Sequence, residues 1–270
     1  MNERGSMTTG KKTALRRLVD YGLYRLGYRL VGLRQREMPV ELSPRDREIY
    51  DYVVGRKLTM VTHEGLLNAM LACRYVEENG ISGDVVECGV WRGGTAIAAA
   101  LVLEALGSKR KIWLYDTFAG MAAPKEADVR VDTGQAAASK HASMQRQDHN
   151  EWAYCSLEDV KANVRAAGIS DEQVRFVEGD VLETLSDAAN LPAKISVLRL
   201  DTDWYESTKK ELEVLYPRVA EGGVLIGDDY GRWKGAQQAT DVYFASEPGA
   251  RPFFQIVNVH ASRCGVKIAG

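Results

Sequence analysis

The segment Asp84-Val-Val-Glu-Cys-Gly-Val-Trp-Arg-Gly-Gly-Thr95 decides the fold, because an apolar run leads through glycines into a helical pattern. Gly89, Gly93 and Gly94 let the backbone approach a ligand closely. The N-terminus of the following helix lies at the same place, and its unpaired N–H groups attract a carboxylate. The segment therefore predicts a ligand-binding turn between a strand and a helix, although a purely structural turn has the same pattern.

The same alternation of apolar, β-branched runs and helical stretches continues to the C-terminus. We expect strands near 84–89, 111–116, 174–178, 195–201, 223–228, 253–259 and 264–268. We expect helices between the first six of them, near 95–106, 156–167, 181–189, 205–216 and 235–245. Such alternation predicts right-handed crossovers and an α/β fold with a doubly wound, mostly parallel, seven-stranded, Rossmann-like sheet. The last two strands leave no room for a helix and should form an antiparallel hairpin at one edge.

Two further helices are expected before this region. Ser43-Pro44 places a capping hydroxyl before a proline at the first helical position. A second helix should begin after Thr62 and stop at Gly80.

Composition and charge exclude several classes of function. The net charge of −2 gives no reason to expect a nucleic-acid partner. No run of about 18 apolar residues is present, so we expect no membrane span. The first residues lack the apolar core of a signal peptide, and four scattered cysteines form no CxxC pair. We therefore expect a cytoplasmic protein without disulfides or a zinc site.

Two stretches depart from the regular pattern. Residues 11–36 hold eight Lys or Arg and one acid, Asp20, with leucines at helical spacing. Such a helix can bind a membrane surface, but packing on its own domain or on a second subunit is our preferred interpretation. Residues 119–150 show no strand or helix face, which is typical of a lid over a binding site or of a disordered insertion. We expect a helical arm over 1–58 and one main domain over 59–270.

Acidic residues follow the first three strands, at the edge where parallel sheets bind ligands. Glu87 would repel a pyrophosphate but pair with an ammonium, and the amino-acid end of S-adenosylmethionine carries both an ammonium and a carboxylate. Asp116, 27 residues after the first glycine, suits a ribose diol or a turn. Asp180 either accepts from an adenine amino group or caps the next helix.

Carboxylates also end the fourth and fifth strands. Asp201 follows one strand, and Asp228 and Asp229 follow the other. Like charges packed together are costly unless a cation neutralises them, and oxygen ligands suit a hard divalent ion such as Mg²⁺. A metal would lower the barrier to deprotonating a sugar hydroxyl, with an adjacent aspartate as the base. We expect Asp203 and Glu206 to be cap and helix-surface residues.

Histidines offer a second source for the base. His141 and His149 lie within the expected lid. Because a lone histidine is usually structural, we regard them as the alternative to the aspartate.

Four segments in order resemble the macrocin O-methyltransferase (TylF-type) family, which methylates sugar hydroxyls of macrolides, aminocoumarins and related natural products. The similarity extends from about Thr59 to Phe244. Its segments are Gly83-Asp-Val-Val-Glu-Cys-Gly-Val-Trp-Arg-Gly-Gly94, Tyr115-Asp-Thr-Phe-Ala-Gly-Met121, Leu200-Asp-Thr-Asp-Trp-Tyr-Glu-Ser-Thr208 with Leu215-Tyr-Pro217, and Gly223-Val-Leu-Ile-Gly-Asp-Asp-Tyr-Gly231.

The resemblance implies a class I methyltransferase fold, S-adenosylmethionine as methyl donor and a magnesium-dependent SN2 transfer. It implies that Asp201 is both catalytic base and metal ligand, with Asp228 and Asp229 as further ligands. It also implies a glycosylated small-molecule acceptor and a homo-oligomer. The residues expected to bind the cofactor are Met60, Val61, Glu87, Gly89, Trp91, Gly93, Thr95, Asp116, Thr117, Ser156, Asp180 and Val181.

The chain departs from the family pattern at four positions. Ala119 and Ala122 replace a common Glu and Pro, so the entry to the lid should differ in shape. Thr202 and Trp204 replace a usual Gly and a smaller apolar residue, which places bulk beside Asp201. These changes leave the chemistry intact and bear on the acceptor.

Two other functions remain open from the residues alone. A nicotinamide-dependent oxidoreductase would use a similar sheet, but the dinucleotide fingerprint G-x-G-x-x-G is absent. A nucleic-acid-binding protein would use the basic arm at 11–36, but it would need a basic face beyond that arm. We therefore expect a methyltransferase with no nucleic-acid or membrane partner.

Overall fold

A computed structural model of the chain describes residues 19, 21–23, 25, 38–246 and 251–268. Contacts divide the chain into two units, Met1–Ser43 and Pro44–Gly270. The basic helix expected over 11–36 lies almost wholly outside the described residues. The helices and strands of the second unit are α2 (Pro44–Gly55), α3 (His63–Glu78), β1 (Asp84–Cys88), α4 (Gly94–Ala105), β2 (Ile112–Asp116), α5 (Ala137–Met144), α6 (Leu157–Ala166), β3 (Val174–Glu178), α7 (Val181–Thr184), β4 (Ile195–Leu200), α8 (Tyr205–Leu215), β5 (Val219–Gly227), α9 (Lys234–Ser246), β6 (Gln255–Ile256) and β7 (Arg263–Val266).

The strands form one seven-stranded sheet in the order β3-β2-β1-β4-β5-β7-β6. The first five pair in parallel, and β7 pairs antiparallel with both β5 and β6. This arrangement confirms the predicted doubly wound sheet with an antiparallel hairpin at its edge. The strand order reverses between β1 and β4, and parallel sheets bind ligands at such a point.

Two elements are shorter than the sequence pattern predicted. Strand β6 spans only Gln255–Ile256, because the edge of the sheet leaves Ile256 65% exposed and little burial favours a longer strand. Helix α7 ends at Thr184 rather than near 189. The side chain of Asp187 caps a separate 3-10 turn by accepting a hydrogen bond from the Ala189 amide.

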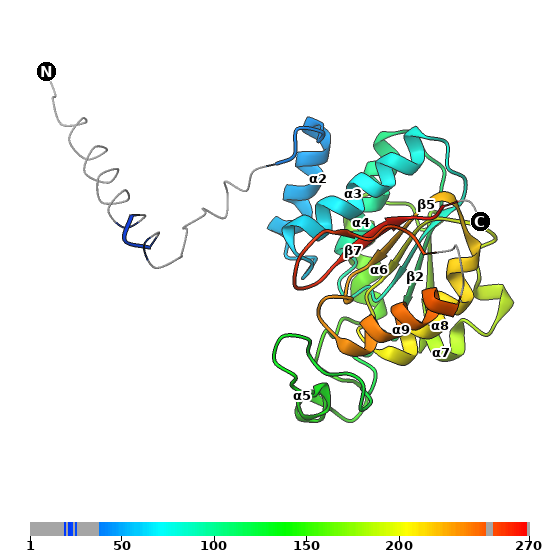
Figure 1. Cartoon of the computed structure of the whole chain (residues 1–270). Helices are drawn as coiled ribbons and strands as arrows, with labels where there is room; N and C mark the ends of the chain where they lie inside the picture. Colours follow the sequence, from blue (N-terminus) through cyan, green and yellow to red (C-terminus); the bar gives the residue numbers. More distant parts are fainter. Residues whose placement is uncertain (1–18, 20, 24, 26–37, 247–250, 269–270) are drawn as a thin grey trace, which may run out of the picture. The chain divides into compact units, whose positions relative to one another are not determined.

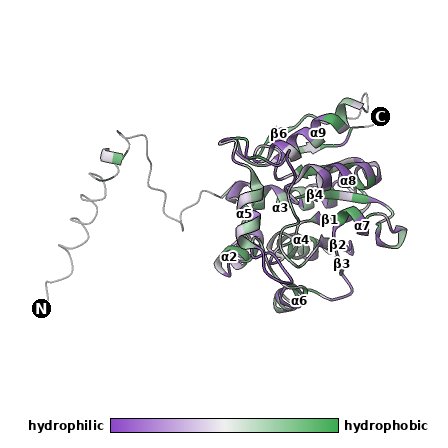
Figure 2. Ribbon diagram, turned by 90° about the horizontal axis from the view of Figure 1, so that it is seen from below, coloured by the Kyte–Doolittle hydropathy of each residue, from purple (hydrophilic) through white to green (hydrophobic). Residues whose placement is uncertain are grey.

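Helices cover both faces of the sheet. Helices α3 and α4, with α2 packed on α4, lie on one face, and α7, α8 and α9 lie on the other (Figure 1). Helix α4 is apolar all round and buried from Gly94 to Leu103, as expected for a helix enclosed by neighbours. The outer helices alternate hydrophobic and hydrophilic residues (Figure 2). No helix among the described residues is long and apolar enough to cross a membrane.

The helix starts predicted at Pro44 and after Thr62 are confirmed. Helix α2 begins at Pro44, and the Thr62 hydroxyl accepts from the Gly65 amide at the start of α3. The Ser156 hydroxyl likewise accepts from the Asp159 amide at the start of α6.

The segment 119–150, in which no helix was predicted, contains α5, and the expectation of irregular structure is wrong there. The segment is also tied to the rest of the domain. Buried Asp128 accepts a hydrogen bond from the Tyr205 amide, and Arg130 forms an isolated β-bridge with Trp233. A sequence pattern of eight residues was too short to reveal the single buried position of α5, Ala137.

Candidate active site

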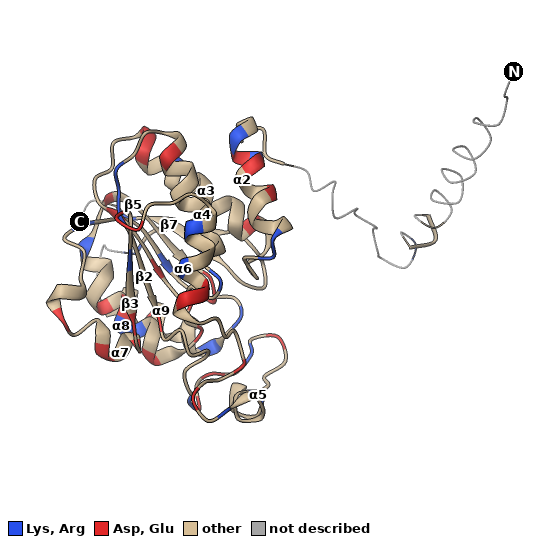
Figure 3. Cartoon of the chain, turned by 180° about the vertical axis from the view of Figure 1, so that it is seen from behind, with Lys and Arg blue, Asp and Glu red and all other residues tan. Residues whose placement is uncertain are grey.

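A cavity of about 370 Å³ opens at the carboxyl ends of β1, β2, β4 and β5. Residues 58–62 and the segment 119–150 complete its wall. Charged residues occur on many helices and loops of the domain, including the segment around α5 (Figure 3). Thirteen of the fifteen residues predicted for the site line the cavity: Met60, Val61, Glu87, Gly89, Trp91, Thr95, Asp116, Thr117, Asp180, Val181, Asp201, Asp228 and Asp229. The residues predicted from the sequence therefore come together around one cavity, and their roles in binding and catalysis stay predictions.

The other two predicted residues lie beside the cavity rather than in its wall. Gly93 precedes α4 with a φ of 82°, and a Cβ there would approach Val160 to 3.1 Å. Ser156 caps α6 and donates its hydroxyl to the Asp159 carboxylate. Their positions indicate structural roles next to the cavity.

The loop after β1 is held in place by close backbone contacts. A Cβ on Gly89, whose φ is 84°, would lie 2.0 Å from the Asp201 carbonyl oxygen, so only glycine fits. Asp116 Oδ2 accepts from the amides of Val90 at 2.6 Å and Trp91 at 3.2 Å. Asp116 thus orders the loop itself, the turn role that the sequence left open, while it also lines the cavity.

Glu87 is buried at the end of β1, and its neighbour across β4 is Arg199. Arg199 Nη1 donates to Glu87 Oε1 at 2.7 Å, whereas Glu87 Oε2 is buried and has no hydrogen-bond partner among the residues that the structure describes. Burial raises the pKa of Glu87 to about 7, although Arg199 lowers it. A buried unpaired carboxylate oxygen costs free energy, so this atom is suited to a cationic ligand.

The three predicted metal ligands lie together at the floor of the cavity. One carboxylate oxygen from each of Asp201, Asp228 and Asp229 lies within 4.8 Å of the others. Arg199 Nη2 lies 2.8 Å from Asp201 Oδ2 and 3.1 Å from Asp228 Oδ1. Burial raises the pKa of Asp201 and Asp229 well above the usual value. Ser262 also donates to Asp228 Oδ1 at 2.8 Å.

Asp203 lines the cavity and does not cap α8, so its predicted role as a cap residue is wrong. The helix begins after Trp204, and Asp203 adopts a φ of 68°. Its amide donates to Asp229 Oδ2 at 3.1 Å. Burial raises the pKa of Asp203 to about 6. The left-handed backbone turns this carboxyl toward Asp229 and the site.

The histidines predicted as alternative bases lie away from the carboxylates. His141 Nε2 lies 3.0 Å from the Met121 carbonyl oxygen, and His149 Nδ1 lies 2.8 Å from Asp148. Neither side chain lines the cavity. The structure therefore does not bring either histidine to the acidic floor.

Two further features of the site were missed. Arg199 was read only as part of a strand, although a charged residue within a fully buried strand signals a paired charge. Trp152, Trp204 and Trp233 form a cluster with ring centroids 5.0–6.0 Å apart along the cavity wall. Their positions in the sequence are too far apart for a pattern to reveal the cluster.

The sheet order, the glycine loop and the acidic strand ends define a class I methyltransferase fold. Comparison with known proteins leads to the same class. A family model described as Macrocin-O-methyltransferase (TylF) matches residues 35–261. The 8-demethyl-8-(2,3-dimethoxy-alpha-L-rhamnosyl)-tetracenomycin-C 4'-O-methyltransferase of Streptomyces olivaceus is 39% identical over 212 residues, 74% of this chain and 76% of that protein. The mycinamicin III 3''-O-methyltransferase of Micromonospora griseorubida is 32% identical, covering 80% and 81%.

Solved structures show the same relationship. The O-methyltransferase NovP superimposes with a TM-score of 0.67 at 31% identity, covering 78% of this chain and 83% of that one. The calicheamicin methyltransferase CalS11 shares the fold, with a TM-score of 0.56 at 17% identity over 88% and 98%. The chain belongs to the macrocin O-methyltransferase (TylF) family and is an S-adenosylmethionine-dependent O-methyltransferase. This assignment excludes the nicotinamide-dependent alternative.

Proposed function

We propose that the protein methylates a sugar hydroxyl of a glycosylated small molecule in antibiotic biosynthesis and uses a divalent metal ion, Mg²⁺. The observation that carries the proposal is the cluster of Asp201, Asp228 and Asp229 on the floor of the cavity that Glu87 also lines. The acceptor class is supported by relatives named for rhamnosyl-tetracenomycin and mycinamicin.

The donor set fits a hard divalent ion. Arg199 contacts Asp201 through Oδ2 and Asp228 through Oδ1, which leaves one carboxylate oxygen of each for a metal. Asp229 supplies the third carboxylate. When bound, Mg²⁺ would offset the repulsion among these groups and lower the pKa of an acceptor hydroxyl.

The other end of the cavity suits the methyl donor. Glu87 Oε2 would accept from the ammonium, and the N-terminus of α4 would take the carboxylate of the amino-acid end. Asp116 and Thr117 would face the ribose, while Asp180 and Val181 would border the adenine. Asp180 also caps α7 by accepting a hydrogen bond from the Leu182 amide, one of the two roles that its sequence position allowed, and we propose the adenine contact as the other.

When bound, S-adenosylmethionine would supply a methyl group whose carbon bonds to the acceptor oxygen as its carbon–sulfur bond breaks, so that the sulfonium would become a thioether. The hydroxyl proton passes to a carboxylate, for which we propose Asp201. Asp203 is a second candidate, because Arg199 holds Oδ2 of Asp201 while Asp203 forms no ion pair among the described residues. The tryptophan cluster would exclude water from this end of the cavity.

The test is methyl transfer from S-adenosylmethionine to glycosylated macrolides, aminocoumarins and tetracenomycins, followed by mass spectrometry of the product. We expect a methylated sugar that forms with Mg²⁺ and not after treatment with EDTA. Methylation of an aglycone hydroxyl would contradict the sugar acceptor, and full activity in EDTA would contradict the metal.

The second part of the proposal concerns the oligomeric state of the protein. We propose a homo-oligomer in which the basic segment 11–36 packs on a second subunit, as its amphipathic pattern and the family resemblance imply. Sedimentation of the full chain and of a chain lacking residues 1–40 tests it. If the full chain is retained on DNA in a salt-dependent way and the chain lacking residues 1–40 is not, the segment would instead bind nucleic acid.

A further inference from the structure

Both acidic and basic side chains line the cavity. Its seven carboxylates are Glu87, Asp116, Asp180, Asp201, Asp203, Asp228 and Asp229. Its four basic side chains are Arg130, Lys140, Arg199 and Arg232. Arg199 is buried among the acids, whereas the other three come from the segment 119–150 and from the loop before α9. We name Arg130, Lys140 and Arg232 the cationic mouth.

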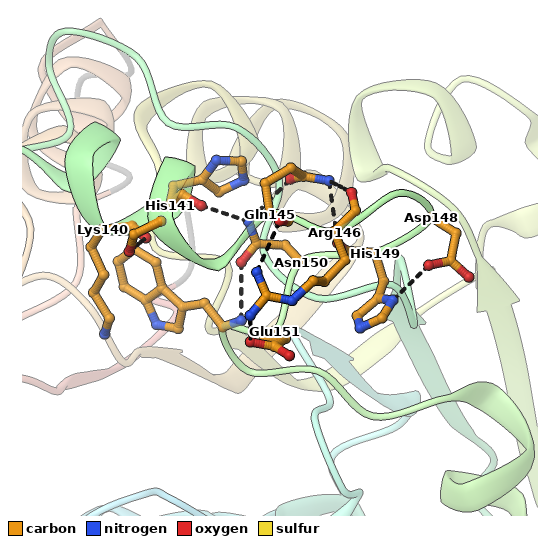
Figure 4. A network of polar contacts seen from close by, with 10 residues as sticks. Lys140, His141, Gln145, Arg146, Asp148, His149, Asn150 and Glu151 are labelled. Carbon is orange, nitrogen blue, oxygen red and sulfur yellow. Dashed lines mark hydrogen bonds and ion pairs between the residues drawn. The ribbon is translucent and has the colours of Figure 1, made fainter.

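The cationic mouth is a fixed part of the structure. Arg130 pairs with Trp233 in a β-bridge, and the Val131 amide donates to the Arg232 carbonyl at 2.9 Å. These bonds hold the two arginines on adjoining segments of the backbone. Lys140 projects from α5, in a segment braced by hydrogen bonds from the Asn150 side chain (Figure 4). The backbone therefore brings three cations together at the opening of the cavity.

These three like charges repel one another, and nearby acids offset part of that repulsion. Burial lowers the pKa of Lys140, Asp203 raises it, and Arg130 and Arg232 each lower it by less than Asp203 raises it. Burial raises the pKa of Asp203 and Asp229, and Arg232 in turn lowers it. No ion pair of Lys140 or Arg232 occurs among the described residues, and Arg130 pairs with exposed Asp132. An arrangement of this kind stabilises a bound anion more than it stabilises the empty protein.

An aromatic surface lies directly beneath these cations. Lys140 Nζ lies 3.8 Å from the ring centroid of Trp152, and the Arg130 guanidinium lies 5.8 Å from that of Trp233. Trp204 anchors the cluster by donating its indole N–H to the Ala122 carbonyl at 2.9 Å. A planar or apolar ring can pack on such a surface while an acidic substituent reaches the cations.

We propose that the acceptor carries an acidic group, which the cationic mouth binds while an adjoining ring packs on the tryptophan cluster. This inference rests on the proposed function, because it describes the second substrate of the same transfer. The acid would orient the acceptor, with its hydroxyl toward the acidic floor and its anion toward solvent. Two sources supply such an anion: the diphosphate of an activated sugar, or an acidic phenol or enol of an aglycone.

Two pairs of small probes separate these sources. Thymidine diphosphate is compared with thymidine, and 4-hydroxycoumarin, an acidic enol, is compared with coumarin. Calorimetry and quenching of tryptophan fluorescence measure their binding to the full-length protein saturated with S-adenosylhomocysteine. We expect one acidic probe to bind about tenfold more tightly than its neutral partner, the gain typical of a charge-assisted hydrogen bond. Raising the salt concentration should reduce that preference.

Variants of the cationic mouth test whether its side chains cause the preference for the acidic probe. Lys140→Met keeps an aliphatic chain over Trp152 and should abolish most of the preference, and Arg130→Met should reduce it. Lys109→Met, at an exposed lysine outside the cavity, is the matched control and should leave it unchanged. Equal binding of acidic and neutral probes, or an equal preference in Lys140→Met, would overturn the proposal.

Failure of this proposal can be told apart from failure of the proposed function. If a neutral glycoside is methylated and Lys140→Met leaves its kcat/KM unchanged, the acidic acceptor is refuted and the sugar methyltransferase stands. If S-adenosylhomocysteine binds but no glycoside of either charge is methylated, the proposed function is refuted.

Discussion

The Arg199 guanidinium and the Glu87 carboxylate form an ion pair 2.7 Å long in which each side chain is only 4% exposed. The second nitrogen of Arg199 reaches Asp201 and Asp228, so one cation joins the cofactor end of the cavity to its acidic floor. Removing one partner of a buried ion pair is costly because it strands the other charge. Variants at this pair must therefore keep a hydrogen-bond acceptor.

Glu87→Gln meets that condition and tests the cofactor site. It retains an oxygen for Arg199 but loses the charge that we assign to the ammonium. We expect the affinity for S-adenosylhomocysteine to fall by roughly 10- to 150-fold, the effect of about 1.5–3 kcal/mol. Calorimetry measures it, with Glu104→Gln on the exposed side of α4 as the control. An unchanged affinity would remove Glu87 from the site.

The raised pKa of Glu87 also predicts a pH dependence. Its pKa is about 7 because of burial, so the group gains a proton as the pH falls below 7. The ammonium binds only the ionised form, and affinity should therefore weaken from pH 7.5 to pH 6, by up to about tenfold per unit below the pKa. Glu87→Gln should bind with no such dependence across this range. If the affinity of both proteins for S-adenosylhomocysteine changes with pH in the same way, Glu87 is not the group that titrates.

Much of the fold followed from the sequence, because hydrophobic period and turn chemistry are local. The strand near 84–89 and the helix start after Thr62 are predictable from the sequence for that reason. Because parallel strands end at the same edge of a sheet, the sequence also predicts that Asp201 lies near Asp228, and the structure brings them together. The ion pairs of Arg199 and the left-handed backbone of Asp203 depend on packing across strands and loops, which no local pattern encodes.

Glu211 predicts a stability that depends on pH. The side chain is fully buried and accepts from the Thr202 hydroxyl at 2.9 Å, and burial raises its pKa to about 8 from an ordinary 4.5. The folded protein thus binds an additional proton between these values, so stability falls as the pH rises through the window. The loss is up to about 1.4 kcal/mol per pH unit.

Glu211→Gln keeps the acceptor oxygen and removes this titration. Between pH 5 and pH 8, the free energy of unfolding in urea should fall for the unmodified protein and should not show this fall for Glu211→Gln. Glu213→Gln, at an exposed position of the same helix, should follow the unmodified protein. If all three proteins show the same pH dependence, Glu211 is not the titrating group.

The segment 119–150 should act as a lid whose parts differ in mobility. Water must leave before methyl transfer to oxygen proceeds well, and closing segments achieve this. The amide of Asn150 donates to the Ala119 carbonyl at 2.8 Å and should exchange slowly. Exposed residues 132–136 should exchange quickly and become protected when cofactor and acceptor bind, whereas the Val131 amide, which donates to the Arg232 carbonyl, should exchange slowly throughout. Hydrogen exchange by mass spectrometry measures this, and strong protection of 132–136 without ligand would refute the lid.

The carboxylates on the cavity floor should separate under mutation into metal ligands and a base. Asp228→Asn and Asp229→Asn each remove one ligand charge and should mainly raise the Mg²⁺ concentration needed for activity. Excess Mg²⁺ should partly restore the activity of these two variants. Asp201→Asn removes a ligand and the proposed base together, so kcat should fall by about 10²–10⁴-fold or more and metal should not restore it. Steady-state kinetics across a Mg²⁺ titration distinguish these outcomes.

Asp203→Asn decides which aspartate takes the proton. Asp203 contacts Asp229 through its amide but lies outside the cluster of Asp201, Asp228 and Asp229, so its loss should leave the metal requirement nearly unchanged. If Asp201 is the base, Asp203→Asn should retain most of kcat. A fall of about 10²-fold or more in Asp203→Asn at an unchanged metal requirement would transfer the base role to Asp203. Binding of S-adenosylhomocysteine should persist in both variants, and Asp148→Asn, at an exposed position outside the cavity, controls for the loss of a surface carboxylate.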